Sequence, residues 1–310
     1  TENLKWCSND FLKLRFLNSF KKIRLFLEMI RFNNLASNVE TNSSVENWLR
    51  KNNFSDFFIA NYLLPMSSSI WSSSQESIKR FPMKSLSSFF KNHGLLNLIK
   101  RPQWFTVLGG SDNYVEKIIN VSDINNVITN AELIIKRDGK KVSLQNKGVT
   151  SQYDLLIFAC HANQIEEILT DISPKEAEIL SMFEYTNNNV LLHDDKNLMP
   201  KEESLWSSWN SFKSKNYDYV TYWMNNLQKL DTEKEIFVTL GNCPEIDEER
   251  VFKKICYEHP LYSENTLEGQ KYLKSIQGEN NTYFVGAHLG YGFHEDGIKS
   301  TAEMLKNINE

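Results

Sequence analysis

The final stretch of the chain constrains its fold more than any other segment. Tyr283–Val285 is apolar and predicts a short buried strand, which Gly286 ends. A glycine-rich turn follows, and Glu295–Leu305 has the pattern of a helix. A strand, a glycine turn and a helix N-terminus place free N–H groups and the positive end of the helix dipole together. The segment therefore predicts a site for an anion or for the polar edge of a ring.

Bulk properties leave room for one large domain or two ordinary ones in the 310 residues. The net charge of −4 gives no electrostatic case for a nucleic-acid partner. The four cysteines are scattered without a Cys-x-x-Cys pair, and the six histidines show no metal-ligand spacing, so we predict no metal site. Cys160 and Cys256 are expected to be buried thiols in a reducing compartment, which favours a cytoplasmic location.

Residues 10–33 predict a basic amphipathic helix. Its apolar residues recur every three or four positions, namely Leu12, Phe16, Phe20, Ile23, Leu27 and Ile30. Two interpretations stay open. The helix either packs on the domain core with a solvated basic face, or it makes peripheral contact with a membrane, at the inner face for a cytoplasmic protein.

The rest of the first hundred residues is predicted to be mostly helical. Ser43 and Glu46 form a capping-box pattern that opens a helix through Lys51. A second helix is expected to stop at Pro65, before a polar connector over residues 67–74.

Strands and helices mix after Pro102. Strands are expected at 104–108, 131–136, 141–145, 154–159, 189–193, 204–209, 219–224 and 236–240. Asp138-Gly139 indicates a hairpin between the second and third of these. This mixture excludes an all-α or an all-β class and predicts a mixed α/β (α+β) protein.

Five segments resemble one protein family, in the order in which that family carries them. They are Tyr62–Trp71, Arg101–Ser111, Tyr153–Ala162, Val220–Gln228 and Gly290–Gly297. On these residues the chain resembles the FAD-dependent amine oxidase and phytoene desaturase superfamily. Within it the chain is most similar to a bacterial subgroup of predicted NAD/FAD-binding, amine-oxidase-like oxidoreductases. The resemblance implies an FAD/NAD(P)-binding two-domain flavoprotein fold, with a substrate domain of mixed sheet and helices.

The same resemblance implies a domain order. Residues 1–100 would be the helical part of the substrate domain, and 101–170 would return to the FAD-binding domain. Residues 171–260 would add the substrate-domain sheet, and 261–310 would be the C-terminal FAD-binding segment. The superfamily begins with a Gly-x-Gly-x-x-Gly turn that holds the FAD pyrophosphate, and this chain has none. Because the chain also starts at Thr1, we expect an N-terminally truncated piece that lacks its first βαβ unit of about 30 residues.

The resemblance also implies cofactor contacts, residue by residue. Gly286 would approach the FAD phosphates or ribitol, and Ala287 stands where the superfamily has an acid. The helix start would face the flavin pyrimidine edge, and the implied contacts there are Gly292, Phe293, His294, Glu295, Asp296 and Gly297. An ordinary loop capped by Asp296 is the alternative.

Four positions elsewhere are weaker candidates for cofactor contacts. Gly109 and Gly110 form either a tight turn or a close approach to the flavin. Trp104 packs either on the cofactor or in the core, and Leu133 loosely matches a position that holds the adenine. No catalytic residue is assigned, because in flavoenzymes the cofactor carries out the redox step.

Two functions remain open, together with a weaker third. The first is an FAD-dependent oxidoreductase that takes hydride from a C–N or C–C bond of a small molecule or, by family analogy, of a lipid acyl chain. Its candidate pocket aromatics, which could equally be sheet core, are Trp206, Trp209, Tyr222 and Trp223. The second is a non-catalytic truncated fragment, and the third is a membrane-surface scaffold that uses residues 10–33.

Overall fold

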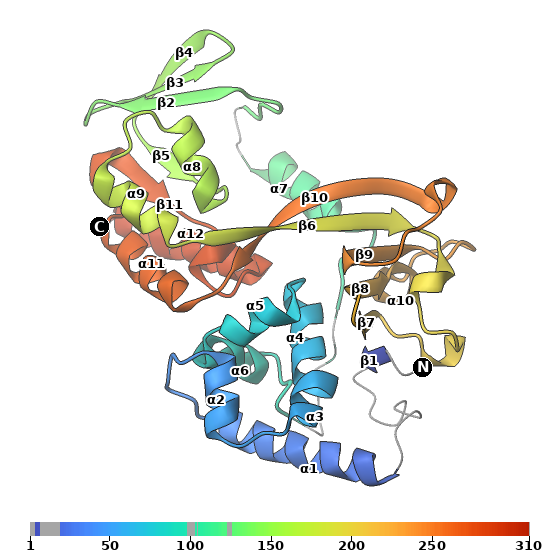
Figure 1. Cartoon of the computed structure of the whole chain (residues 1–310). Helices are drawn as coiled ribbons and strands as arrows, with labels where there is room; N and C mark the ends of the chain where they lie inside the picture. Colours follow the sequence, from blue (N-terminus) through green and yellow to red (C-terminus); the bar gives the residue numbers. More distant parts are fainter. Residues whose placement is uncertain (1–3, 7–18, 98–102, 104, 123–125, 310) are drawn as a thin grey trace. The chain divides into compact units, whose positions relative to one another are not determined.

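The computed structural model describes residues 4–6, 19–97, 103, 105–122 and 126–309 (Figure 1). The chain divides into two units, each made of two separate stretches. Unit 1 comprises Thr1–Asp123 and Asn187–His259, and unit 2 comprises Ile124–Thr186 and Pro260–Glu310. The chain therefore passes from one unit to the other three times, after residues 123, 186 and 259; the sequence placed domain breaks after 100, 170 and 260.

Unit 1 begins with a helical layer. The helices of this layer are α1 (Ser19–Ala36), α2 (Val45–Lys51), α3 (Asp56–Phe58), α4 (Leu64–Trp71), α5 (Gln75–Arg80) and α6 (Met83–Asn92). Unit 1 also contains α7 (Asp112–Val121), which has no buried residue. Phe32 of α1 is fully buried, and its ring lies 5.6–6.3 Å from four other aromatic rings. Such ring pairs add to the stabilisation that burial of their area provides. The helical layer is therefore held by an apolar, mostly aromatic core.

Three sequence predictions in this layer are wrong. The helix does not stop at Pro65, because a π-helical turn over Ile59–Leu63 joins α3 to α4 and the proline falls in the first turn of α4. The expected polar connector is instead buried helix as far as Trp71, and within it Ser69 Oγ donates to Pro65 O at 2.8 Å. Ser67 Oγ is buried and has no hydrogen-bond partner among the described residues. The N-cap of α2 is Ser44, not Ser43.

The second part of unit 1 is a six-stranded sheet in the order β1-β7-β8-β9-β6-β10. Its strands are β1 (Leu4–Trp6), β6 (Glu184–His193), β7 (Trp209–Lys213), β8 (Asp218–Trp223), β9 (Phe237–Asn242) and β10 (Val251–Leu261), with the short helix α10 (Met224–Gln228) between β8 and β9. β6 and β10 are the long strands that cross from one unit to the other.

The sheet differs from the sequence prediction in three places. The predicted strand at 204–209 is a 3-10 turn over Glu203–Leu205, followed by β7. The predicted strand at 104–108 is irregular over its described residues 105–108. The long strand β10 was missed, because charged and polar residues interrupt its apolar pattern. Cys256 of β10 is exposed and Cys160 is only half-buried, although both were expected to be buried.

Unit 2 combines two small sheets with four helices. The strands β2 (Leu133–Arg137), β3 (Val142–Asn146) and β4 (Val149–Tyr153) form an antiparallel meander, so the predicted Asp138-Gly139 hairpin is present and β4 extends it. β5 (Leu156–Phe158) pairs in parallel with β11 (Thr282–Phe284). The helices are α8 (Ala162–Ile168), α9 (Pro174–Ser181), α11 (Glu264–Ser275) and α12 (His294–Asn309). Ile157 of β5 is 42% exposed, although a fully buried strand was expected there.

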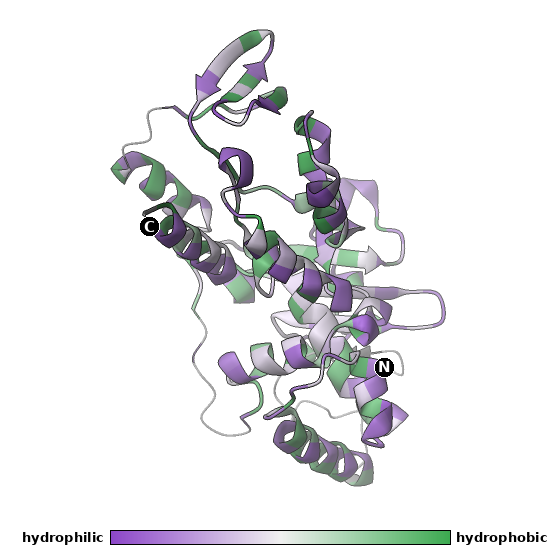
Figure 2. Cartoon of the chain, turned by 90° about the vertical axis from the view of Figure 1, so that its left-hand side faces the viewer, coloured by the Kyte–Doolittle hydropathy of each residue, from purple (hydrophilic) through white to green (hydrophobic). Residues whose placement is uncertain are grey.

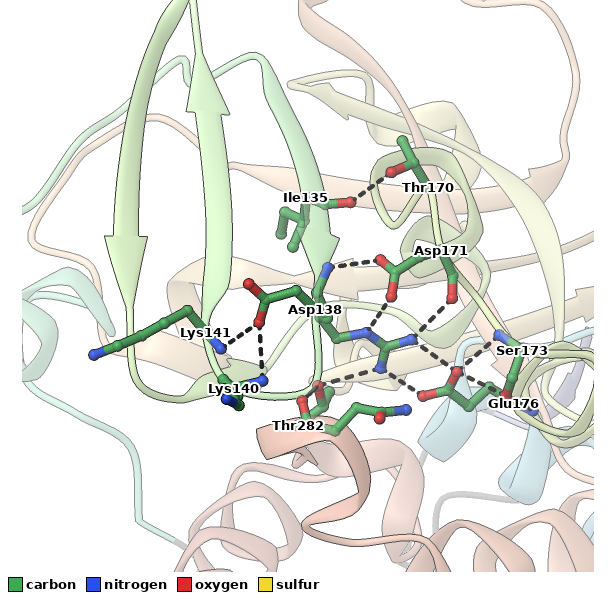
Figure 3. A network of polar contacts seen from close by, with 11 residues as sticks. Ile135, Asp138, Lys140, Lys141, Thr170, Asp171, Ser173, Glu176 and Thr282 are labelled. Carbon is green, nitrogen blue, oxygen red and sulfur yellow. Dashed lines mark hydrogen bonds and ion pairs between the residues drawn. The ribbon is translucent and has the colours of Figure 1, made fainter.

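A buried ion-pair network joins three parts of unit 2 (Figure 3). Arg137, whose side chain is 1% exposed, donates to Glu176 Oε1 at 2.6 Å, to Asp171 Oδ2 at 2.9 Å and to Thr282 Oγ1 at 3.2 Å. Burial opposes the ionisation of Glu176, but Arg137 and Ser173 outweigh it and hold the pKa of this carboxyl below its ordinary value. The network thus fixes β2 to α9 and β11 through a buried pair, Arg137 and Glu176, with Asp171 as a partner that is 25% exposed.

Candidate flavin-binding segment

The turn after β11 has a backbone that only glycine adopts without strain. Gly286 has φ 146° and ψ 169°. Its N–H donates to Ser300 Oγ of α12 at 2.9 Å, and Ser300 in turn donates to Gly297 O at 2.7 Å. A Cβ at Gly286 would lie 2.8 Å from the His288 ring. Hydrogen bonds therefore join the turn after β11 to α12, at a position where no side chain covers the backbone.

The start of α12 offers a free hydrogen-bond donor. Asp296 accepts the Phe293 N–H on Oδ2 at 3.1 Å, so its carboxylate caps its own helix, as the alternative interpretation of this loop expected. The N–H of Glu295 has no partner among the described residues, and the Glu295 side chain is directed along the helix, 3.9 Å from Lys299. A helix N-terminus with a free N–H favours an anion or an electron-rich ring edge.

Residues of other segments, Gln270 and Tyr262, contact the loop between β11 and α12. Gln270 of α11 donates Nε2 to His288 O at 2.9 Å and to Gly290 O at 2.8 Å. Gly292 has φ 93°, and a Cβ there would lie 2.6 Å from Tyr262 Oη. No sequence motif indicates the roles of Gln270 and Ser300, because each side chain contacts the loop from a helix that lies beside it only in the folded unit.

His288 lies beneath the turn and is 6% exposed. Its ring packs edge-on against Phe183 at 5.1 Å, and its Nε2 has no hydrogen-bond partner among the described residues. Burial, assisted by the nearby His161, lowers the pKa of His288 to about 4. The imidazole is therefore neutral at pH 7 and supports the Gly286 turn by packing.

The hydrogen-bonding groups of this segment can be compared with the groups that FAD would present to them. The bare turn at Gly286 and the free N–H of Glu295 fit a phosphate or ribitol approach and the polar edge of a flavin ring. Ala287 supplies no carboxylate for a ribose or ribitol hydroxyl, and Asp296 uses an oxygen in its cap. The segment thus fits a flavin through backbone donors and lacks the acid that the resemblance would place at Ala287. No group of three His, Cys, Asp or Glu side chains in the described part of the chain could hold a metal ion.

The other sequence candidates lie elsewhere. Leu133 is half-buried at the start of β2, in unit 2. Gly109 and Gly110, both with positive φ, form a turn of unit 1 that is closed by the bond from Asn113 Nδ2 to Leu108 O at 2.7 Å. Trp104 lies outside the described residues.

The four candidate pocket aromatics pack in the core of unit 1. Trp206 lies 5.4 Å from Trp223 and 5.6 Å from Phe237, ring to ring, and its Nε1 donates to Pro200 O at 2.7 Å. Tyr222 donates to Ser69 O at 3.0 Å, and Trp209 pairs with it across β7 and β8. These contacts match the alternative interpretation, in which the four residues are sheet core.

Unit 1 contains a cavity of about 810 Å³ where β9 separates from β6. The β6–β9 ladder ends at the pair Val190 and Leu240, whereas β9 stays paired with β8 as far as Asn242. Amide, aliphatic and thiol side chains line the opening, among them Asn189, Leu191 and Cys243, together with the charged Glu245, Glu248 and Lys254. Small-molecule sites have about this volume.

Comparison with known proteins finds matches only at the level of structure. No protein-family model and no curated protein matches the chain. Among solved structures, putrescine oxidase bound to putrescine has a TM-score of 0.61 and 12% identity over 95% of this chain and 77% of that chain. The fatty acid isomerase of P. acnes that produces CLA gives 0.60 and 12% over 94% and 75%.

A third match is cyclohexylamine oxidase from Brevibacterium oxydans IH-35A, with a TM-score of 0.58 and 9% identity over 93% of this chain and 76% of that chain. These identities are too low to carry over residue roles, but the coverage spans nearly the whole chain. The mixture of helix and sheet agrees with the fold class that the sequence predicted. The chain has the fold of putrescine oxidase and cyclohexylamine oxidase, which agrees with the fold that the sequence resemblance implied.

Proposed function

We propose that this chain is part of an FAD-dependent oxidoreductase whose flavin contacts the segment from Gly286 to Gly297. The observation that carries the proposal is the bare glycine turn at the end of β11, joined to a helix start with a free N–H at Glu295. The fold supports it, because the matched structures include two oxidases. FAD, when bound, would accept hydride from the substrate.

The protein's own residues would position the cofactor. Gly286 permits close approach of the backbone, Glu295 donates its N–H, and Gln270 with Ser300 keeps the loop in place. A helix N-terminus next to the flavin would stabilise negative charge on the reduced ring. No side chain is assigned to proton transfer.

For the substrate we propose a small organic molecule, with a lipid acyl chain as the specific candidate. The cavity of unit 1 supports this, because its aliphatic residues suit a carbon chain and its asparagines suit a polar end. The names of the matched proteins include both a diamine ligand and a fatty acid.

The test is titration of the purified protein with FAD, followed by flavin fluorescence and by absorbance near 450 nm, as expected for a bound flavin. We expect weak, saturable binding, because the sequence contains no Gly-x-Gly-x-x-Gly turn for the pyrophosphate. Absence of saturation and of any rise in melting temperature with FAD would favour the alternative, a non-catalytic fragment.

A further inference from the structure

Helix α1 has two apolar faces, and only one of them packs on the core. Leu25, Met29, Phe32 and Ala36, at spacings of four, three and four, are buried. Phe20, Ile23 and Leu27, at spacings of three and four, lie on another face and are 74%, 59% and 59% exposed. Phe26 lies beside them and is 41% exposed. We call Phe20, Ile23, Phe26 and Leu27 the α1 stripe.

The α1 stripe corrects one sequence expectation. The sequence pattern predicts that the line through Phe20, Ile23 and Leu27 meets the core if the helix packs there. Leu12 and Phe16 of the same line lie outside the described residues. In the structure the core face lies about half a turn from that line, so the line is left in solvent. Figure 2 shows that hydrophilic and hydrophobic residues alternate along α1.

The rotation of α1 is fixed by polar contacts as well as by packing. Glu28 accepts the N–H of Ser55 at 3.0 Å and the Ser55 hydroxyl at 2.5 Å. Arg31 lies over the Phe54 ring at 4.5 Å and donates to Asn53 O at 3.3 Å. The helix therefore cannot turn the α1 stripe inward without breaking these contacts and unpacking Phe32.

The charge on α1 is opposite to that of the chain. Lys21, Lys22, Arg24 and Arg31 stand against the single acid Glu28, so α1 has a net charge of +3, whereas the whole chain has −4. Basic residues that flank an exposed apolar stripe suit a surface that is both anionic and apolar just below its polar layer. None of the described helices is long and apolar enough to cross a membrane.

We propose that the α1 stripe and its basic neighbours bind the surface of an anionic lipid membrane, with the helix lying in the plane of the surface. Phe20, Ile23 and Leu27 would enter the boundary between head groups and acyl chains, and the lysines would lie among the lipid phosphates. This inference does not depend on the proposed flavin chemistry.

The test is co-sedimentation of the purified protein with vesicles, one set of pure phosphatidylcholine and one set with equal parts of phosphatidylglycerol. We expect binding to the anionic vesicles at least tenfold tighter than to the neutral ones, and a loss of binding at high salt. The double variant Phe20→Ser, Leu27→Ser should lose at least tenfold in affinity. Its fold should remain, because both side chains are exposed.

A matched control comes from another helix of the same unit. Ile118 and Val121 of α7 are 53% and 84% exposed, so the double variant Ile118→Ser, Val121→Ser removes comparable exposed apolar area elsewhere. We expect its vesicle binding to equal that of the wild type. The variant Lys21→Gln, Lys22→Gln should retain its fold and bind anionic vesicles several-fold more weakly.

Three results would overturn the proposal. One is the absence of binding to either vesicle, and another is equal binding by the wild type and the α1 stripe variant. The third is a wild-type dimer in light scattering that becomes a monomer in the stripe variant while vesicle binding stays absent, which would make the stripe an interface between copies of the chain.

Discussion

The helical layer of unit 1 and the core of unit 2 are stabilised by different physics. In unit 1 the rings of Trp48, Phe54, Phe58 and Phe90 surround Phe32. In unit 2 the guanidinium of Arg137 is buried between two carboxylates and a hydroxyl. Loss of one ring leaves a smaller apolar core, whereas loss of one charge leaves its partners buried and unpaired. We therefore expect unit 2 to respond more steeply than unit 1 to a change in a single residue.

The two units can be monitored separately. All seven tryptophans of the chain lie in the ranges of unit 1, so tryptophan fluorescence reports on unit 1 alone. Far-ultraviolet circular dichroism reports on both units, because each contains helices and strands.

Replacement of Arg137 should have the largest effect. Arg137→Met leaves the buried Glu176 and the 25% exposed Asp171 without their cation. Removal of one partner of a buried ion pair, here that of Glu176, costs about 3–5 kcal/mol. The dichroism midpoint in urea should fall strongly, and the tryptophan midpoint should fall less. Lys141→Met is the control, because its pair with Asp154 is exposed and should be worth about 1 kcal/mol or less. Equal falls in both signals would show that the units unfold together.

Gly286→Ala should have the next largest effect. A side chain at φ 146° costs about 1–3 kcal/mol, and the added Cβ would meet the His288 ring. Gly297→Ala is the control on the same segment, because the nearest atom to its Cβ is Ala287 N at 3.8 Å. We expect the melting temperature to fall in Gly286→Ala and to stay unchanged in Gly297→Ala. A Gly286→Ala protein as stable as the wild type would contradict the strained turn.

Acid should weaken unit 2 through His288. The pKa of His288 is about 4 in the folded state and 6.5 ordinarily, so between these values the unfolded state binds more protons than the folded state. The free energy of unfolding therefore decreases as the pH decreases. This pKa difference should lower the free energy of unfolding by about 2 kcal/mol between pH 7.5 and pH 5.0. His288→Gln should remove this part of the pH dependence, as measured by urea unfolding at both pH values. An unchanged pH dependence in the variant would assign the acid sensitivity to other groups.

A ring replacement in unit 1 should have the smallest effect. Phe32→Leu retains most of the apolar volume, so we expect the free energy of unfolding to fall by about 1 kcal/mol. Urea unfolding followed by tryptophan fluorescence measures this loss. The comparison between the units fails if this loss equals or exceeds that of Arg137→Met.

Local patterns predicted the C-terminal segment well. Glycine at 286 and the apolar residues before it indicated a strand that ends in a bare turn, and the structure has β11 and the turn there. The Asp138-Gly139 hairpin was equally local. Both depend on residues that are neighbours along the chain, so the sequence contains the whole signal.

Features that depend on distant contacts were not predictable. Gln270 reaches the Gly290 carbonyl from α11, and Arg137 meets Glu176 and Thr282, which lie 39 and 145 residues away. The buried face of α1 was misjudged because two apolar lines lie on that helix and only packing selects one of them. The sequence predicted that a helix ends at Pro65, whereas a π-helical turn before the proline joins that helix to α4.

The central claim is that the segment from Gly286 to Gly297 holds a flavin. The most direct test is an FAD titration of the wild type, of Gly286→Val and of Gly139→Val, in the same buffer. Gly139 also has a positive φ, in the β2–β3 hairpin of the same unit, and so controls for strain alone. The account predicts saturable binding by the wild type and by Gly139→Val, and at least tenfold weaker binding by Gly286→Val. Equal binding by all three would place the flavin elsewhere and contradict the account.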